Sequence, residues 1–428
     1  MTNDQFAQYG AGFPRRVVVT GVGLVTPVGI GREESWRALL AGENGITGVT
    51  LCDAHDIESR VAGEVKDFDA LNYVDRKEAR RMDRFTHLAI AASAEAHEQS
   101  GLDVSVAADE IGAMIGVGIG GLTWLEEGYK TLFEKGPDRI SPFLVPAFIP
   151  DMASGQVSIR FGLRGPNYNT VSACASGADA LGTALEVIRR GDAVAMLAGG
   201  AEATITRMGI ASFSALRALS TKRNDDPAHA SRPFDLERDG FVLGEGAATL
   251  VLEDLEYAQA RGATILAEFV SYGQSADAFH VTQPSEDGEG AARAMRTALA
   301  KAGIPASAID YINPHGTSTP MNDKFETMSV KAVFGEAAGA IPMPSTKSMT
   351  GHTLGACGGI EAAVTVLSIR DQRIHATRNL TIPDPDCDLD YVPKGPRDLR
   401  IDWAMSNNLG FGGHNSSLVF RRWGGDPN

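Results

Sequence analysis

Residues 171–181 read VSACASGADAL, a run of small side chains that surrounds one cysteine, Cys174. Side chains this small allow a sharp turn from a strand into a helix, and the pattern predicts that helix over residues 177–190. A strand is predicted next, over 193–198. The same alternation occurs upstream, where a predicted helix over 88–101 precedes a strand over 110–117. Alternating helices and strands indicate an α/β protein with largely parallel sheets.

Two segments recur in outline about 180–200 residues later, which indicates two related halves. The helix, linker and strand over 91–121 resemble the order over 291–316. The helix after the cysteine turn resembles a helix over 358–370, which follows a Thr-Gly-His turn. We place the junction near residues 257–264, so the predicted halves are 16–262 and 263–424.

The first predicted strand, RVVVTGVG over residues 16–23, has the glycine turn with which a dinucleotide-binding unit begins. The fingerprint is incomplete, because Thr26 stands at the third glycine position and Pro27 follows at once. We therefore interpret this segment only as a strand buried on both faces.

Composition argues against several classes of protein. The formal net charge of −15 argues against general nucleic-acid binding, which requires a basic surface. No apolar run reaches the ~18 residues that a membrane span needs, and the first thirteen residues do not resemble a signal peptide. The four cysteines are scattered, so we predict neither a disulfide framework nor a zinc site, and a reducing, cytoplasmic setting.

Cys174 is the candidate nucleophile. The helix that follows would point its positive end at the sulfur, and this position lowers a cysteine pKa. The alternative is a small buried hydrophobic residue, since free cysteines are often buried. We give that second interpretation to Cys52, Cys357 and Cys387, which lack the combination of features.

Two histidines occupy comparable turns. His315 follows a predicted strand, where α/β proteins keep their ligands, and His352 precedes a helix in the place that echoes Cys174. Each could instead be a core histidine bonded to a carbonyl group. Lys347 and Glu326 are candidates for supporting roles, with an ordinary surface charge as the alternative. A loop is predicted over 406–415.

A basic cluster could bind an acidic partner despite the overall negative charge. Spacing of three and four residues would place its members on one face of a helix, although a solvated helix face is the commoner explanation. The cluster comprises Lys77, Arg80, Arg81 and Arg84.

Four motifs together resemble those of the β-ketoacyl-acyl-carrier-protein synthases, closest to synthase II. They are TVSACASGADAL (170–181), NPHGTSTPMNDKFE (313–326), STKSMTGHTLGACGG (345–359) and NNLGFGGHNSSLVF (407–420). The segment RPFDLERDGFVLGEGA over 232–247 is also similar, and the likeness extends over residues 16–423. The resemblance implies a thiolase-like fold with five layers, α-β-α-β-α, built from two related βαβ-type halves.

The resemblance also assigns roles. Cys174 matches the nucleophile that accepts the acyl chain, and His315 and His352 match the pair that assists malonyl decarboxylation. Lys347 matches the lysine of the family pattern, Glu326 the carboxylate that belongs with it, and Phe411 the gate whose backbone N–H completes an oxyanion hole. The implied substrate-binding residues are Ile119, Phe213, Thr282, Thr317 and Thr319, and the implied carrier-docking residues are Lys77, Arg80 and Arg81.

The implied reaction is a decarboxylative condensation of malonyl-acyl-carrier protein with an acyl chain held on Cys174, in fatty acid elongation. It requires no cofactor and no metal, because loss of carbon dioxide drives it. The implied partners are acyl carrier protein, in its acyl and malonyl forms, and a second copy of the chain in a homodimer.

Several alternatives are weighed against this function. A biosynthetic thiolase would carry a second cysteine near the last loop, and residues 406–417 hold none. A type III synthase would have asparagine in place of His352. A non-catalytic polyketide partner subunit would lack Cys174, whereas a ketosynthase of a type II polyketide pathway remains the second candidate. The sequence departs from the family pattern at Pro314, Asn322, Leu409 and His414. These departures leave the preferred length of the acyl chain open.

Overall fold

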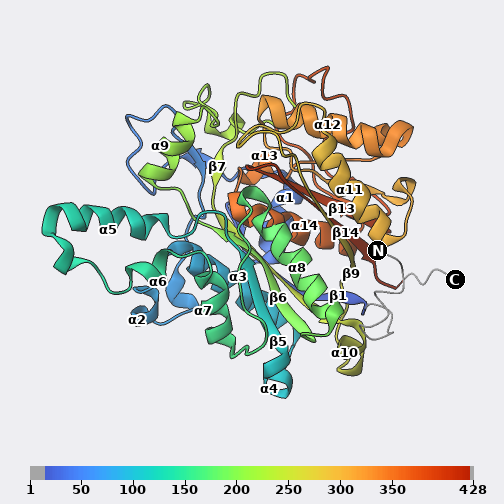
Figure 1. The fold of residues 1–428 in the computed structure, drawn as a ribbon. Helices are drawn as coiled ribbons and strands as arrows, with labels where there is room; N and C mark the ends of the chain where they lie inside the picture. The colour runs from blue at the N-terminus through green and yellow to red at the C-terminus, as the bar shows by residue number, and fades with distance from the viewer. Residues whose placement is uncertain (1–14, 425–428) are drawn as a thin grey trace.

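The computed structural model describes residues 15–424 (Figure 1). The start of the chain, over which we predict no signal peptide, lies outside the described residues. None of the described helices is long and apolar enough to cross a membrane.

One mixed sheet runs through the molecule and joins both predicted halves. Its strands, in spatial order, are β10 (Tyr311–Asn313), β13 (Trp403–Gly410), β14 (His414–Arg422), β9 (Ala267–Ala276), β1 (Val17–Thr26), β8 (Gly246–Asp254), β6 (Ala195–Glu202) and β5 (Ile111–Gly116), and β2 (Gly29–Ile30) pairs with β1. Within this sheet, as far as the structure describes it, only β10 with β13 and β5 with β6 pair in parallel. The prediction of largely parallel sheets is therefore wrong, because neighbouring strands return antiparallel around β1 and in the β13–β14 hairpin.

Helices divide this sheet into layers. On one side α3 (Arg84–Ser100) packs on β1, β6 and β8, and on the other α11 (Glu289–Ala302) packs on β9 and β14, with α12 (Pro320–Phe334) beside it. Between the two halves of the sheet lie α8 (Ser176–Arg190) and α14 (Cys357–Asp371), which contact each other and strands of both halves. The expected five-layered, thiolase-like α/β arrangement is confirmed (Figure 1).

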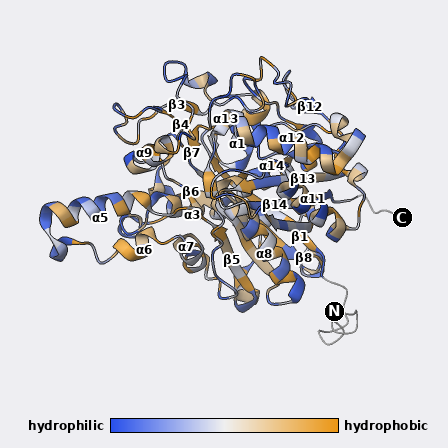
Figure 2. Cartoon of the chain, turned by 45° about the horizontal axis from the view of Figure 1, so that its top comes forward, coloured by the Kyte–Doolittle hydropathy of each residue, from blue (hydrophilic) through white to orange (hydrophobic). Residues whose placement is uncertain are grey.

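The middle position of α14 follows from its composition. Every residue from Cys357 to Ile369 is buried, and a helix that is apolar on all sides is stable only inside a protein. Figure 2 shows hydrophobic residues along the interior strand β5, where all six residues are buried.

The remaining elements are short or peripheral. The helices are α1 (Arg32–Ala41), α2 (Arg76–Ala79), α4 (Val104–Ala107), α5 (Leu122–Lys135), α6 (Leu144–Phe148), α7 (Met152–Phe161), α9 (Arg207–Ala215), α10 (Leu255–Ala260) and α13 (Lys347–Thr350). The small sheets contain β3 (Ile46–Gly48), β4 (Val61–Gly63) and β7 (Leu243–Gly244), and β11 (Arg373–Ile374) with β12 (Arg397–Asp398). Helix α5 projects from the body at the left of Figure 1.

The two central helices begin in the same way. A single 3₁₀ turn precedes each, over Ala173–Ala175 before α8 and over Leu354–Ala356 before α14. The first residue of each turn has a left-handed backbone, with φ of 51° at Ala173 and 48° at Leu354. The residue equivalent to Cys174 is therefore Gly355. The prediction placed His352 at this equivalent position, and the structure places it three residues earlier.

The predicted loop over 406–415 is wrong at both of its ends. Strand β13 continues to Gly410 and β14 begins at His414, so only 411–413 form a turn. The asparagines and serines of this hairpin have low strand propensity. They are nevertheless stable there because their buried side chains find partners, as Ser417 does at 2.8 Å from the Asn407 amide oxygen.

Candidate active site

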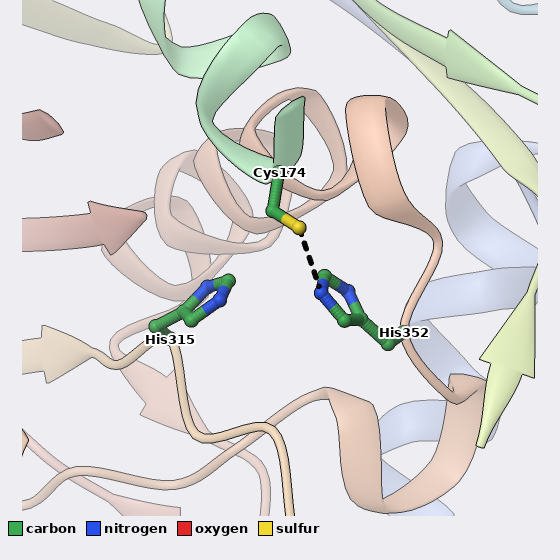
Figure 3. Close-up of side chains that lie close together, drawn as sticks. All are labelled: Cys174, His315 and His352. Atoms are coloured by element: carbon green, nitrogen blue, oxygen red, sulfur yellow. Dashed lines mark hydrogen bonds between the residues drawn. The ribbon is translucent and has the colours of Figure 1, made fainter. Parts of the chain in front are cut away.

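The three candidate catalytic side chains converge on one point. Cys174 stands in the turn before α8, His315 follows β10, and His352 follows α13. The Cys174 Sγ lies 3.1 Å from the His352 Nε2, and the two imidazole rings meet edge-on with centroids 5.2 Å apart (Figure 3). A sulfur from the first predicted half therefore meets two imidazoles from the second.

Burial of Cys174 favours its neutral thiol form. Burial raises its pKa to about 12, against the opposing effects of the Lys347 ammonium and the Phe411 backbone N–H. The expectation that the helix terminus would yield a thiolate is therefore not met. The cause is desolvation, since only 6% of the residue is exposed.

Both histidines are neutral as well. Burial moves the pKa of His315 and of His352 well below the usual value, and the nearby Lys347 ammonium lowers both further. A neutral imidazole can accept the thiol proton at one nitrogen or donate an N–H from it, depending on the tautomer. The site therefore contains two imidazoles that are suited to base or donor roles at neutral pH.

Lys347 pairs with a different carboxylate from the one predicted. Its ammonium forms a buried ion pair with Glu361 of α14, donates to the His315 backbone carbonyl at 2.6 Å and lies 3.4 Å from the His315 Nδ1. Glu361 also accepts from the Asn408 side chain at 2.6 Å. The predicted partnership of Lys347 with Glu326 is wrong, because Glu361 reaches inward from the central helix.

Glu326 supports the backbone of the histidine turn instead. Its carboxylate accepts from the N–H groups of His315 at 2.7 Å and Gly316 at 2.8 Å. Burial raises its pKa to about 7, although these two N–H groups favour the ionised form. Glu326 thus fixes the backbone of the turn that follows β10 and carries His315.

We expect the substitution Glu361→Gln to lower the free energy of unfolding by about 3–5 kcal/mol, since it leaves the Lys347 charge buried without its partner. Urea unfolding of the variant and of the unmodified protein measures the difference. The double variant Lys347→Met/Glu361→Gln is the matched control and should recover most of the loss. A loss below about 1 kcal/mol in the single variant would show that the ion pair does not stabilise the centre.

Two buried carboxylates at the site escaped the sequence analysis. Glu361 had a recognisable signal, since it is a lone charge within the apolar helix 357–369 and such a charge needs a partner. Glu202 ends β6 and accepts from the backbone N–H groups of Gly118, Gly120 and Gly355. No local pattern indicated it, because its partners are distant in the sequence.

Cys357 also has more than a packing role. Its sulfur lies 3.0 Å from the His352 Nδ1, on the side of the ring opposite Cys174, and 3.6 Å from the Thr353 hydroxyl. A thiol can either accept or donate a hydrogen bond, so His352 keeps a partner in both of its neutral tautomers.

A cavity of about 490 Å³ opens onto the Cys174 sulfur. Phe241 forms part of its wall and packs edge-on against both Phe213 and His352. All the predicted substrate-binding residues line this cavity, together with the predicted gate; they are Ile119, Phe213, Thr282, Thr317, Thr319 and Phe411. Leu409 lines it too.

The basic cluster is only partly as predicted. Helix α2 ends at Ala79, and Arg84 opens α3, where it forms an ion pair with the buried Glu245 at 2.7 Å. The idea of one helix face that includes Arg84 is therefore wrong. The exposed side chains surround a shallow surface depression beside Phe143, whose ring lies 4.4 Å from the Arg81 guanidinium; they are Arg76, Lys77, Arg80 and Arg81.

Comparison with known proteins gives a consistent family. The model described as "Beta-ketoacyl synthase, N-terminal domain" matches residues 14–258, and "Beta-ketoacyl synthase, C-terminal domain" matches 266–381. A 3-oxoacyl-[acyl-carrier-protein] synthase 2 of Staphylococcus aureus is 53% identical over 410 residues, covering 96% of this chain and 99% of the relative. A protein of the same name from Synechocystis sp. is 52% identical and covers 96% and 98%.

Solved structures agree in fold. A beta-ketoacyl synthase from Burkholderia phymatum STM815 superposes with a TM-score of 0.89 at 40% identity and covers 95% of this chain and 99% of its own. A type II PKS ketosynthase, solved with its acyl-carrier protein and bound to the hexaketide, has the same TM-score at 37% identity and covers 96% and 99%.

Proposed function

This chain belongs to the β-ketoacyl synthase family, and from that membership we propose that it condenses malonyl-acyl-carrier protein with an acyl chain held on Cys174. The product would be a 3-ketoacyl-acyl-carrier protein, as in fatty acid elongation. The observation that carries the proposal is the 3.1 Å contact of the Cys174 Sγ with the His352 Nε2, beside His315 and at the end of a cavity.

In the first half-reaction Cys174 attacks the acyl thioester. The neutral thiol passes its proton to the His352 Nε2, and the sulfur forms a bond to the acyl carbon. The backbone N–H groups of Cys174 and Phe411 stabilise the oxyanion, a contribution of about 3–4 kcal/mol for each donor. When the bond to the carrier sulfur breaks, the leaving thiolate takes the proton back from His352.

In the second half-reaction the malonyl group loses carbon dioxide. The electrons of the broken carbon–carbon bond form an enolate, whose oxygen accepts N–H groups from His315 and His352. The Lys347 ammonium beside the His315 Nδ1 favours the proton on the other nitrogen of that ring. His352 can also carry its proton on Nε2, because the Cys357 sulfur beside its Nδ1 can donate a hydrogen bond as well as accept one. The carbanion then attacks the acyl carbon, and the released Cys174 thiolate regains a proton from solvent.

Mass spectrometry tests the proposal most directly. We expect the intact protein, incubated with acyl-carrier protein loaded with acyl groups of graded length, to gain one acyl group, located at Cys174 by peptide mapping. Addition of malonyl-carrier protein should then release a 3-ketoacyl product two carbons longer. Labelling at another residue, or acylation without any condensation product, would reject the assignment.

A ketosynthase of a type II polyketide pathway is the second candidate, supported by the likeness to the structure bound to a hexaketide. The higher identity to the synthase 2 relatives favours fatty acid elongation. Copurification with a paralogue that lacks the nucleophilic cysteine, or formation of a poly-β-keto product, would favour the polyketide function.

Acyl carrier protein is the proposed partner, and Lys77, Arg80 and Arg81 its proposed docking site. These exposed cations are a local excess in a chain of net charge −15, so they would attract an acidic surface.

Charge reversal tests this docking site. We expect Arg80→Glu/Arg81→Glu to raise the apparent KM for carrier-bound acyl substrate about 10-fold or more, while the KM for a small acyl thioester stays the same. Steady-state kinetics with both substrates provides the comparison. The matched control is Arg160→Glu, a charge reversal on α7 outside the cluster. An unchanged carrier KM would place the docking site elsewhere.

We further propose a cytoplasmic homodimer that needs no cofactor or metal for the reaction. Helix α5 supports self-association, because its Phe133 is 82% exposed and its Tyr129 55% exposed, and the two rings stack against each other. Sedimentation of Phe133→Asp against the unmodified chain would test this arrangement.

A further inference from the structure

We propose that Cys174, His315 and His352 together form a binding site for a thiophilic divalent cation, with Zn²⁺ as the best fit, and that the bound metal blocks acyl loading. One potential ligand atom from each residue lies within 4.8 Å of the others, and all three side chains are buried (Figure 3). The inference rests on this geometry and does not depend on the proposed condensation.

The donor set narrows the class of metal. One thiolate and two imidazoles suit Zn²⁺ and other transition metals that bind sulfur, Cu²⁺ included, and a soft sulfur ligand disfavours Mg²⁺ and Ca²⁺. In tetrahedral zinc, three protein ligands leave one position open. The cavity that ends at Cys174 gives the ion a path of entry and leaves room for a water at the fourth position.

The surroundings already orient one of the ligands, His352. Histidines that bind a metal generally donate the N–H of their other ring nitrogen to a fixed partner. The Cys357 sulfur, 3.0 Å from the His352 Nδ1, can accept that hydrogen bond. The His352 Nε2 then directs its lone pair at the region beside the Cys174 Sγ, 3.1 Å away. Only a small separation of these two atoms is needed to admit an ion between them.

His315 is the weakest of the three ligands. The Lys347 ammonium lies 3.4 Å from its Nδ1, and this positive charge opposes both a proton on that nitrogen and a nearby dication. Glu361 offsets much of the repulsion, because it is ion-paired with the same ammonium. We therefore expect a ranking in which Cys174 and His352 contribute more to the affinity than His315.

Binding displaces one proton and changes no oxidation state. The Cys174 thiol loses its proton to solvent as the sulfur–zinc bond forms, and His352 supplies the lone pair of its Nε2. His315 supplies the lone pair of its Nε2 only when its proton moves to Nδ1, which the Lys347 ammonium 3.4 Å away opposes. The metal occupies the sulfur that would otherwise receive the acyl group, so zinc and the acyl chain exclude each other.

Cobalt titration of the full chain, stripped of metal and kept reduced, tests the site. Bound Co²⁺ should show a thiolate-to-metal charge-transfer band and the intense visible bands of a tetrahedral site, at one ion per chain. Zn²⁺ should remove these bands by displacement. Bands of a six-coordinate site, or no charge-transfer band, would overturn the proposal.

Variants locate the ligands. We expect Cys174→Ala to eliminate the charge-transfer band and weaken zinc affinity at least about 100-fold, His352→Ala to cause a comparable loss of affinity, and His315→Ala about a 10-fold loss. Cys52→Ser is the matched control, since Cys52 lies near the exposed His55 and Asp53, where an adventitious ion could bind. A band that survives Cys174→Ala, or that disappears in Cys52→Ser, would refute the site.

Covalent blocking provides an independent readout if a variant fails to fold. Unmodified protein alkylated at Cys174 by iodoacetamide should no longer bind Co²⁺, and Zn²⁺ should slow the alkylation. Retention of the bands after alkylation would contradict the proposal. Because none of these readouts requires turnover, a chain that binds zinc but does not condense acyl groups would overturn only the proposed function.

Discussion

Replacement of Cys174 by alanine should abolish formation of the acyl-enzyme and reduce condensation by at least about 10⁴-fold, because no other group supplies the nucleophile. The other cysteine near His352 is Cys357, which faces the opposite side of the imidazole. Cys357 is buried and does not line the cavity, so it cannot reach an acyl thioester as a substitute nucleophile. Mass spectrometry of the protein after exposure to acyl-carrier protein measures the loss directly.

The same variant should keep its fold and its capacity to decarboxylate malonyl-carrier protein. Removing one sulfur atom creates little empty volume, and the two imidazoles that face the enolate are unchanged. Cys387→Ala is the matched control, since Cys387 is a buried thiol of the apolar cluster around α11 and β13, outside the cavity. Acylation of the Cys174→Ala protein would show that the nucleophile lies elsewhere.

The order of elements was accessible from the sequence because it depends on local patterns. Helices and strands such as α8, β6, α11 and β10 lie within a few residues of the predicted ranges. Strand direction was not accessible in the same way. Pairing of β1 with β8 and β9 is set by contacts more than 200 residues apart, and the alternation of helices and strands does not determine it.

The hairpin of β13 and β14 shows a second limit. Its asparagines, serines and glycines are residues of turns when only local propensity is considered. Here they are strand residues, and some of their side chains have partners from other elements, as the Asn408 amide N–H has in Glu361. Polar strands buried in this way can be recognised only when the tertiary structure is known.

The cysteine and the two histidines of the candidate site were predicted, but two of its buried carboxylates and its electrostatics were not. The turns that carry Cys174, His315 and His352 have recognisable motifs. The protonation of Cys174 depends instead on how deeply the surrounding layers bury it. Likewise the choice of Glu361 rather than Glu326 as the partner of Lys347 depends on the tertiary structure that brings these two side chains together, which no local pattern describes.

Replacement of His315 by alanine should slow malonyl decarboxylation by about 10²–10³-fold, since it removes one of two N–H donors to the enolate oxygen. Acylation of Cys174 should change by no more than about 3-fold, because the thiol contacts His352 and the oxyanion of that step accepts backbone N–H groups. Release of labelled carbon dioxide measures decarboxylation. Acyl-enzyme formation in single-turnover experiments measures acylation.

Two further variants distinguish a donor role from a structural one. His315→Gln offers an amide N–H in a similar direction and should recover part of the decarboxylation rate, whereas His97→Ala removes a histidine of α3 outside the cavity and should leave both steps unchanged. Equal losses of acylation and decarboxylation in His315→Ala would mean that the variant distorts the turn held by Glu326. Because the Lys347 ammonium and Glu326 both hold this turn from outside the cavity, we expect the two rates to separate.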